Sequence, residues 1–277
     1  MYQRIFIPVD GSQRSWDVVD AAAVLADRWD CPLEIVSVVR FESVREQVES
    51  EMARQMEAAD WPAGTRSTVL AGIERSPGEF VADLVNETPG SLVVMSTTGH
   101  GRSAAVLGST ATEIIAHTTT PVLLYGPHAK PTAPQGTTLV VAVDGTSRSE
   151  EAVGLAGAWS VGLDVEPWVV TVVNPDIETA VDAVEDVIAQ SVARRLVKLV
   201  DRGVQFETLH DRRPAVALTD FAAGVDAALL IEATHAREGA DRFRHGSVAM
   251  ASVRHARLPV LLIHGIGGDA VHYQYSS

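Results

Sequence analysis

The chain has 277 residues, a length that suits two domains of ordinary size. Hydrophobic residues make up 46% of it and charged residues 21%, so a largely disordered chain is excluded, and no stretch approaches the ~20 apolar residues of a membrane span. Acidic residues outnumber basic ones by 36 to 22, and the formal net charge of −14 argues against nucleic acid or an anionic membrane as a partner.

Predicted strands and helices alternate along the first half of the chain. Short apolar runs rich in β-branched residues predict strands at 4–9, 33–39, 66–71, 92–96 and 122–125. Helical spacing of apolar residues predicts helices at 15–30, 42–59 and 109–118. A further helix is expected after Ser76, because Pro77 and Glu79 complete the pattern of a capped helix start, and it ends near Glu87.

The second half repeats the first. Strands are expected there near 138–143, 166–173, 204–209, 227–232 and 260–263. Asp10 falls on Asp144 after the first strand of each copy, and Gly108 falls on Gly246 before the last helix. A repeat of half the chain length indicates a duplicated domain. We therefore predict two domains, 1–128 and 136–265, joined by a proline-containing tether.

Strict alternation of strand and helix predicts parallel strands with right-handed crossovers. Each copy should therefore be an α/β domain with a doubly wound, five-stranded parallel sheet. In such sheets ligands bind beyond the carboxyl ends of the strands, at the point where the strand order reverses. The loops after the first and fourth strands are the places where a site is expected.

Asp10 and Asp144 each follow the first strand of their copy. A carboxylate at a strand end can accept hydrogen bonds from a ligand hydroxyl or amine. It can equally cap the helix that follows. The presence of the aspartate in both copies does not separate the two roles, because a duplication carries either one along.

A glycine-containing loop follows the fourth strand of the first copy and runs from Thr97 to Gly108. Glycines let the backbone approach a ligand closely, and the start of a helix offers free N–H groups to an anion. Ser109, at the start of that helix, can cap it and also donate a hydrogen bond to a phosphate. The loop is a candidate phosphate cradle, although ordinary turns and caps use the same residue types.

Together these features resemble the universal stress protein family, over nearly the whole chain and twice. The first copy shows it in Pro8-Val9-Asp10-Gly11-Ser12, Gly101, Gly108-Ser109 and Thr120-Pro121-Val122-Leu123-Leu124. The second copy shows it in Val143-Asp144-Gly145-Thr146, Gly246-Ser247 and Leu258-Pro259-Val260-Leu261-Leu262. The resemblance implies a tandem member of the family, with two repeats of its adenine-nucleotide hydrolase-like fold.

The ATP-binding branch of that family carries a phosphate-holding motif of Gly, two residues, Gly, nine residues and Gly-Ser/Thr. In the first copy Thr98 takes the place of the leading glycine, and six residues instead of nine separate Gly101 from Gly108. In the second copy the nine-residue spacing up to Gly246 is intact, but Ala233 and Ala236 replace both glycines. An alanine methyl keeps the backbone farther from a phosphate, so the first copy is favoured.

Carried over residue by residue, the resemblance implies nucleotide-binding positions in both copies. In the first they are Pro8, Val9, Asp10, Val38, Thr98, Gly101, Arg102, Gly108, Ser109 and Thr110. In the second they are Asp144, Val172, Ala236, Gly246, Ser247 and Val248. We predict no catalytic and no metal-binding residue, because neither a carboxylate pair for a metal nor a positioned base is recognisable.

We therefore expect a cytoplasmic stress-response protein that binds ATP or a related adenine nucleotide, with or without Mg²⁺, for sensing or regulation and not for catalysis. The single cysteine and the lack of a recognisable signal peptide agree with that compartment. Two alternatives stay open: a nucleotide-free dimeric scaffold for protein contacts, and an enzyme that hydrolyses ATP slowly. The two copies are expected to pair through their last strands as an internal pseudo-dimer, and two chains can associate further as a homodimer.

Overall fold

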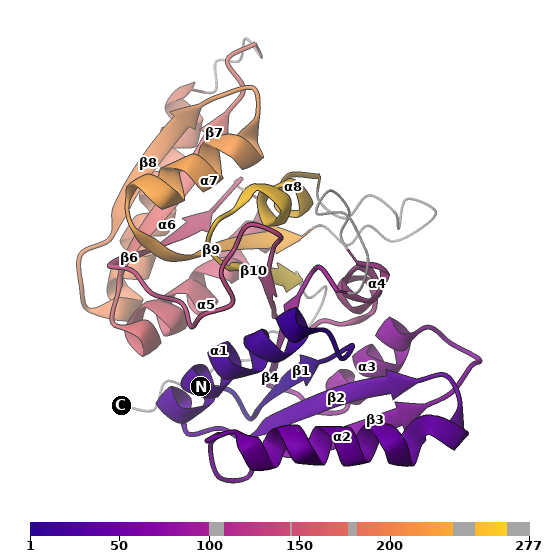
Figure 1. The fold of residues 1–277 in the computed structure, drawn as a ribbon. Helices are drawn as coiled ribbons and strands as arrows, with labels where there is room; N and C mark the ends of the chain where they lie inside the picture. Colours follow the sequence, from indigo (N-terminus) through magenta and orange to yellow (C-terminus); the bar gives the residue numbers. More distant parts are fainter. Residues whose placement is uncertain (100–107, 145, 177–181, 235–246, 265–277) are drawn as a thin grey trace. The chain divides into compact units, whose positions relative to one another are not determined.

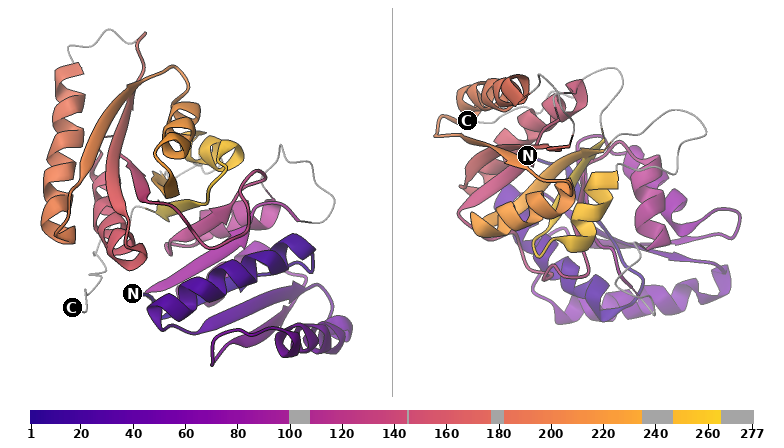
Figure 2. Two further views of the ribbon diagram at one scale, coloured as in Figure 1. Left: turned by 60° about the vertical axis from the view of Figure 1, so that its left-hand side comes forward. Right: turned by 90° about the horizontal axis from the view of Figure 1, so that it is seen from above.

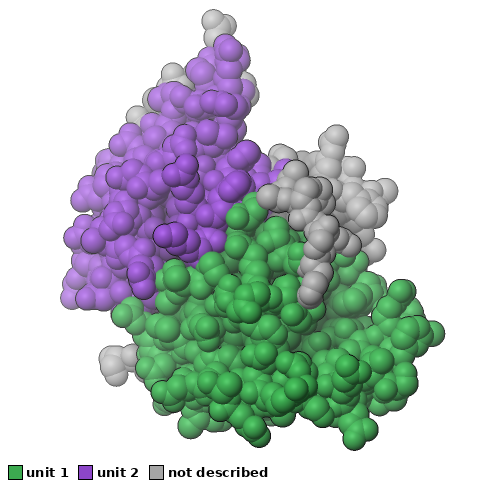
Figure 3. Space-filling model, viewed as in Figure 1, with its two compact units in different colours: residues 1–127, 131–133 green, residues 128–130, 134–277 purple. Residues whose placement is uncertain are grey.

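The chain forms two compact units in the computed structural model, which describes residues 1–99, 108–144, 146–176, 182–234 and 247–264. Unit 1 comprises residues 1–127 and 131–133, and unit 2 comprises residues 128–130 and 134–277 (Figure 3). The strands within each unit are parallel, so the predicted fold class of two repeated α/β domains is confirmed.

The sheet of unit 1 has the strand order β3-β2-β1-β4-β5, and neighbouring strands are parallel. Its strands are β1 (Arg4–Pro8), β2 (Leu33–Val39), β3 (Arg66–Ala71), β4 (Ser91–Ser96) and β5 (Val122–Tyr125). The chain builds the sheet outward from β1 to β3 and then returns to the other side of β1 for β4. The strand order therefore reverses between β1 and β4.

Four helices cover this sheet: α1 (Gln13–Trp29), α2 (Arg45–Ala58), α3 (Pro77–Asn86) and α4 (Ser109–His117). Right-handed crossovers that run in opposite directions along a sheet lie on opposite faces. Accordingly, α1 and α2 lie on one face and α3 and α4 on the other (Figures 1 and 2). The short 3-10 helix η1 (Glu42–Val44) precedes α2, so the single predicted helix at 42–59 is divided in two.

The helix starts follow from side-chain caps. Ser76 and Glu79 form the predicted capping box of α3, and the hydrogen bonds from Ser76 lower the pKa of Glu79. The start of α1 lies at Gln13, two residues before the predicted one, because Ser12 is the N-cap. The Ser12 hydroxyl accepts a hydrogen bond from the Ser15 N–H at 3.3 Å.

Unit 2 repeats the path with the strand order β8-β7-β6-β9-β10. Its elements are β6 (Thr138–Ala142), α5 (Ser147–Leu163), β7 (Glu166–Val173), α6 (Asp182–Val200), β8 (Gln205–His210), α7 (Pro214–Gly224), β9 (Ala227–Thr234), α8 (Ser247–His255) and β10 (Val260–His264). Neighbouring strands are again parallel. The predicted strands of the second half are therefore present, with ends displaced by two residues at most.

The strand registers show which residues of the two units are equivalent. Ser96 pairs with Tyr125 in unit 1, and Ala233 pairs with Ile263 in unit 2. Since the last strands of the two copies match residue for residue, Ala233 corresponds to Ser96, two residues away from the match that the glycine motif suggested. By the same register Met95 of unit 1 corresponds to Glu232 of unit 2.

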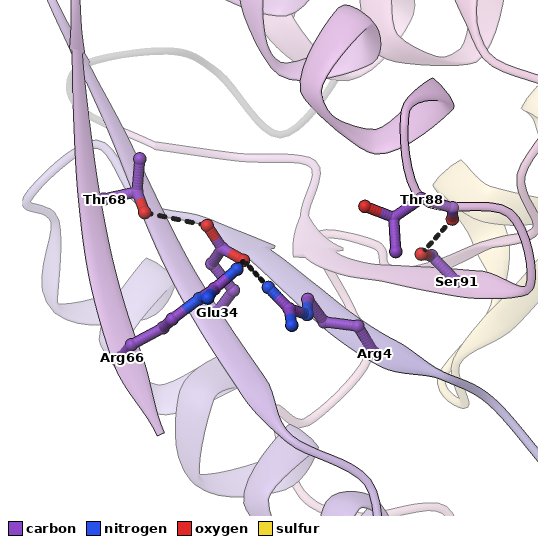
Figure 4. A network of polar contacts seen from close by, with 6 residues as sticks. All are labelled: Arg4, Glu34, Arg66, Thr68, Thr88 and Ser91. Atoms are coloured by element: carbon purple, nitrogen blue, oxygen red, sulfur yellow. Dashed lines mark hydrogen bonds and ion pairs between the residues drawn. The ribbon is translucent and has the colours of Figure 1, made fainter. Parts of the chain in front are cut away.

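A buried carboxylate joins three strands of unit 1 near their amino ends (Figure 4). The Glu34 side chain on β2 is 3% exposed, and its Oε2 atom lies 2.6 Å from both Arg4 Nη1 on β1 and Arg66 Nη2 on β3. Thr68 Oγ1 donates to Glu34 Oε1 at 2.7 Å. Opposite charges and hydrogen bonds thus compensate the burial of this carboxylate.

We expect Glu34→Ala to lower the free energy of unfolding of unit 1 by about 3 kcal/mol, because it leaves the mostly buried Arg4 without its counter-charge. Arg66→Ala is the matched control, and it should cost less than about 1 kcal/mol because the Arg66 side chain is 57% exposed. Urea unfolding of the two variants measures the difference. Equal losses would show that the network does not depend on the buried carboxylate.

Glu232 in unit 2 is a buried carboxyl group without such compensation. It is 3% exposed, and its Oε1 atom has no hydrogen-bond partner among the described residues. Burial raises the pKa of Glu232 to about 7, and the nearby Ser252 hydroxyl opposes that rise. In the folded protein the group is therefore a neutral acid below about pH 7, whereas in the unfolded chain it ionises at its ordinary pKa of about 4.3.

We expect Glu232→Gln to stabilise unit 2 at pH 9 and to stabilise it much less at pH 5. A raised pKa in the folded state means that stability falls as pH rises toward and through about 7, and glutamine does not titrate. The gain should be on the order of 4 kcal/mol at most at pH 9 and about 1 kcal/mol at pH 5, because each pKa unit is worth about 1.4 kcal/mol. Urea unfolding of both proteins at both pH values gives the comparison, and an equal effect at pH 5 and pH 9 would contradict it.

Candidate functional site

A cleft of about 670 Å³ opens in unit 1 at the carboxyl ends of the strands. It lies where the strand order reverses between β1 and β4, which is the place expected for a ligand in a doubly wound sheet. Residues from the ends of β1, β2 and β4 and from all four helices line it. Eight predicted residues are among them: Pro8, Val9, Asp10, Val38, Thr98, Gly108, Ser109 and Thr110.

Asp10 is exposed at the edge of this cleft, and it does not cap α1 itself. Its Oδ1 atom instead accepts hydrogen bonds from the N–H of Ser12 at 3.0 Å and from the Ser12 hydroxyl at 2.6 Å. The helix cap is therefore Ser12, and Asp10 orients it. Asp10 therefore contributes to the cap of α1 only indirectly, through its hydrogen bonds with Ser12. The Asp10 carboxylate itself lines the cleft.

Gly99 lies directly against Asp10. A Cβ atom at residue 99 would lie 1.9 Å from Asp10 Oδ2, a separation that real side chains do not reach. Only glycine at this position lets the loop after β4 come so close to the carboxylate. The sequence offered no specific reason to select Gly99, because the family motif placed its first glycine at residue 98.

Arg14 and Ser96 hold the loop after β4 in position. Arg14 Nε donates to Ser96 Oγ at 3.0 Å, and another guanidinium nitrogen donates to the Gly126 carbonyl. Ser96 Oγ donates in turn to the Thr98 carbonyl at 2.9 Å. Burial lowers the pKa of Arg14, and Asp17 opposes that shift. No pattern in the sequence indicates these hydrogen bonds of Arg14, although the arginine recurs as Arg148 in the second copy.

The start of α4 faces the cleft without a side-chain cap. Its N-cap residue is Gly108, whose N–H donates to the Thr97 carbonyl at 2.9 Å, so the predicted capping role of Ser109 is not observed. Ser109 is exposed and Thr110 partly exposed, and both line the cleft. The first N–H groups of a helix, the positive end of its dipole and two hydroxyls together favour an anion at this position.

The far part of the cleft combines an apolar floor with a polar wall. Val38 is partly exposed and lies at the end of β2, and Met95 contributes from β4. Helix α2 contributes Gln47, Glu51 and Arg54, of which the last two form an ion pair. An apolar floor with a few polar groups is the usual composition of a small-molecule site.

Some of the remaining predicted residues are not described by the structure, and the others lie in unit 2. Gly101, Arg102, Ala236 and Gly246 lie outside the described residues, as does the Ser247 side chain. In unit 2, Asp144 Oδ1 accepts from the N–H of Thr146 at 3.0 Å and from its hydroxyl at 2.6 Å, which repeats the arrangement at Asp10. Val172 and Val248 are partly exposed on β7 and α8. Unit 2 thus preserves the geometry of the strand-end aspartate.

Membrane-spanning helices and metal-binding groups are both absent from the described parts of the chain. No helix there combines the length and the apolarity that a bilayer crossing demands. Histidine, cysteine, aspartate and glutamate side chains in the same residues form no group of three or more that could hold a metal ion.

Solved structures with the same fold cover almost the entire chain. A universal stress protein from Archaeoglobus fulgidus DSM 4304 is 17% identical, covers 95% of this chain and 96% of its own, and has a TM-score of 0.68. A functionally unknown protein from Pseudomonas aeruginosa PAO1 is 13% identical, with coverages of 95% and 93% and a TM-score of 0.69. Identities this low establish the fold alone.

Shorter solved structures match about half of the chain. A universal stress protein from Archaeoglobus fulgidus in complex with dAMP is 24% identical, covers 47% of this chain and 98% of its own, and has a TM-score of 0.36. No curated protein matches the chain.

The sequence model of the universal stress protein family matches the chain twice, at residues 1–126 and at residues 137–264. The two matches together span nearly the whole chain and agree with the two repeated sheets. The chain therefore belongs to the universal stress protein family and carries two of its domains in tandem.

Proposed function

We propose that the unit 1 cleft binds ATP or a related adenine nucleotide, and that the protein is a cytoplasmic stress-response protein that senses or regulates through this nucleotide. The observation that carries the proposal is the meeting of Asp10, Val38 and the start of α4 in one cleft. Each matches one chemical part of a nucleotide: a ribose, a base and a phosphate.

The polar groups of the cleft suit these three parts. The Asp10 carboxylate accepts hydrogen bonds from ribose hydroxyls, and it is pre-oriented because it already accepts two hydrogen bonds from Ser12. The N–H groups and hydroxyls at Ser109 and Thr110 donate to phosphate oxygens. The apolar Val38 side chain lies against the base. Mg²⁺ would accompany a bound triphosphate and would neutralise part of its charge.

Sensing fits the ionisable groups of the described cleft better than catalysis does. They are Asp10, Glu51 and Arg54: Asp10 holds Ser12, and the other two form an ion pair with each other. Slow hydrolysis of ATP and a nucleotide-free scaffold role are the two competing functions.

The proposal is tested by mass analysis of small molecules released from purified, denatured protein, followed by calorimetric titration with ATP, ADP, AMP and cAMP. Stoichiometric adenine nucleotide, or micromolar binding of any of the four, supports it. Absence of both would favour the scaffold. Release of phosphate from ATP that depends on Asp10 or Ser109 would favour an enzyme.

We expect Asp10→Ala to weaken nucleotide binding roughly tenfold to a hundredfold, since it removes charge-assisted hydrogen bonds to the ribose. Asp144→Ala is the matched control, because it removes the same pair of hydrogen bonds to a helix start in unit 2. Calorimetric titration of both variants gives the affinities. The reverse result, with Asp144→Ala weakened and Asp10→Ala unchanged, would place the nucleotide in unit 2.

We expect Gly99→Ala to weaken nucleotide binding about as much as Asp10→Ala does, although it removes no polar group. The added methyl group cannot stay 1.9 Å from Asp10 Oδ2, so it displaces the carboxylate or the loop. Gly154→Ala serves as the control, because a Cβ at that helix position in unit 2 meets no atom within 4 Å. Unchanged affinity in Gly99→Ala would show that the close contact between residue 99 and Asp10 does not matter for binding.

A further inference from the structure

Two tryptophans form a stacked pair at the wall of the unit 1 cleft. Trp16 lies in the first turns of α1 and lines the cleft, and Trp61 lies in the loop between α2 and β3. Their ring centroids are 6.2 Å apart, and their planes differ by only 6°. Both side chains are partly exposed. This is the offset-stacked geometry that aromatic pairs favour.

The pair is held in place from behind. Trp61 Nε1 donates a hydrogen bond to Asp20 Oδ1 at 2.9 Å, and Asp20 lies one helical turn beyond Trp16 on α1. This bond fixes the plane of Trp61, and the stack then restricts the plane of Trp16. An exposed indole normally samples several rotamers, and binding a ligand normally costs the entropy of ordering it. Here that ordering is already present before a ligand arrives.

Groups that recognise the edges of a base surround the same cleft. Gln13 lines it from the first turn of α1, and Gln47 and Gln55 line it from α2. A side-chain amide can both donate and accept hydrogen bonds, as the edge of a nucleic-acid base does. Within their own helices, Gln13 Nε2 donates to Asp17 Oδ1 at 2.8 Å and Gln55 Nε2 donates to Glu51 Oε1 at 3.4 Å. A fixed aromatic plane beside such amides is the combination by which proteins bind bases through stacking.

From this geometry we propose that Trp16 is a base-stacking residue of the unit 1 cleft. The planar base of the bound nucleotide lies against the indole of Trp16, while Trp61 and Asp20 act as positioning residues that hold the indole. The inference rests on the proposed nucleotide binding and adds a determinant of specificity to it. Purines stack over a larger area than pyrimidines, so the site prefers purine nucleotides.

The test compares Trp16→Leu and Trp16→Phe with the control Trp29→Leu. Trp29 lies at the other end of α1 and does not line the cleft. Its ring packs against Tyr2, with 5.4 Å between the two ring centroids. We expect Trp16→Leu to weaken AMP binding about tenfold to a hundredfold, while Trp16→Phe keeps most of the affinity and Trp29→Leu keeps it fully. UMP should bind less tightly than AMP to the wild-type protein and lose less in Trp16→Leu.

A second readout does not depend on affinity. Stacking of a base on Trp16 should quench part of the tryptophan fluorescence during AMP titration of the wild-type protein and of Trp29→Leu. The quench should be absent in Trp16→Phe, a variant that keeps an aromatic ring and should therefore fold even if Trp16→Leu does not. Circular dichroism of each variant verifies folding.

The outcomes separate this inference from the proposed function. Wild-type affinity for AMP in Trp16→Leu, or the same quench in Trp16→Phe as in the wild type, overturns the stacking role and leaves nucleotide binding intact. Failure of the wild-type protein to bind any nucleotide in calorimetry removes both. Equal loss in Trp16→Leu and Trp29→Leu would show that α1 merely loses stability, and it also overturns the inference.

Discussion

The candidate site depends on one constraint: parallel strands all end at the same edge of their sheet. In unit 1 the chain leaves β1 toward β2 and returns on its other side as β4, so the loops after β1 and β4 are neighbours. That path places Asp10 against Gly99. It also places both residues in the same cleft as the start of α4. No long-range coincidence of side chains is needed, because the topology alone places these groups together.

Within that frame, packing determines how close the groups come. Gly99 lets the loop after β4 touch the Asp10 carboxylate, and Gly108 leaves the first turn of α4 without a side-chain cap. The two glycines thus act in different ways: Gly99 permits a close contact, and Gly108 supplies no side chain that could cap the helix. A larger residue at either position would change the shape of the cleft, although glycine has no side chain with which to contact a ligand.

Much of the fold could be predicted from the sequence, because short apolar runs bounded by turn residues identify buried parallel strands. The observed bounds of β2, β3 and β5 agree with the predicted ones to the residue. The capping box at Ser76 was also recognisable, since its members are three residues apart. The start of α1 was placed two residues late, because the sequence alone does not distinguish Ser12 from Ser15 as the cap.

The site itself was less predictable, because its decisive contacts join distant residues. The separation between Trp16 and Trp61 is 45 residues, and no pattern in the sequence links them. Nothing in the sequence distinguishes Glu232 from the other residues of its predicted strand. The fold shows that Glu232 is buried at the position that Met95 occupies in unit 1. Glycine spacing alone also misaligned the two copies, whereas strand pairing aligns them.

The brace at Arg14 has a consequence for how the chain leaves unit 1. One planar guanidinium holds both Ser96, at the rim of the cleft, and the Gly126 carbonyl, immediately after β5. A guanidinium does not flex, so these two points keep a constant spacing. The tether toward the second half therefore departs from an anchored point and not from a fraying strand end, and that anchor shares its serine with the ligand-facing loop.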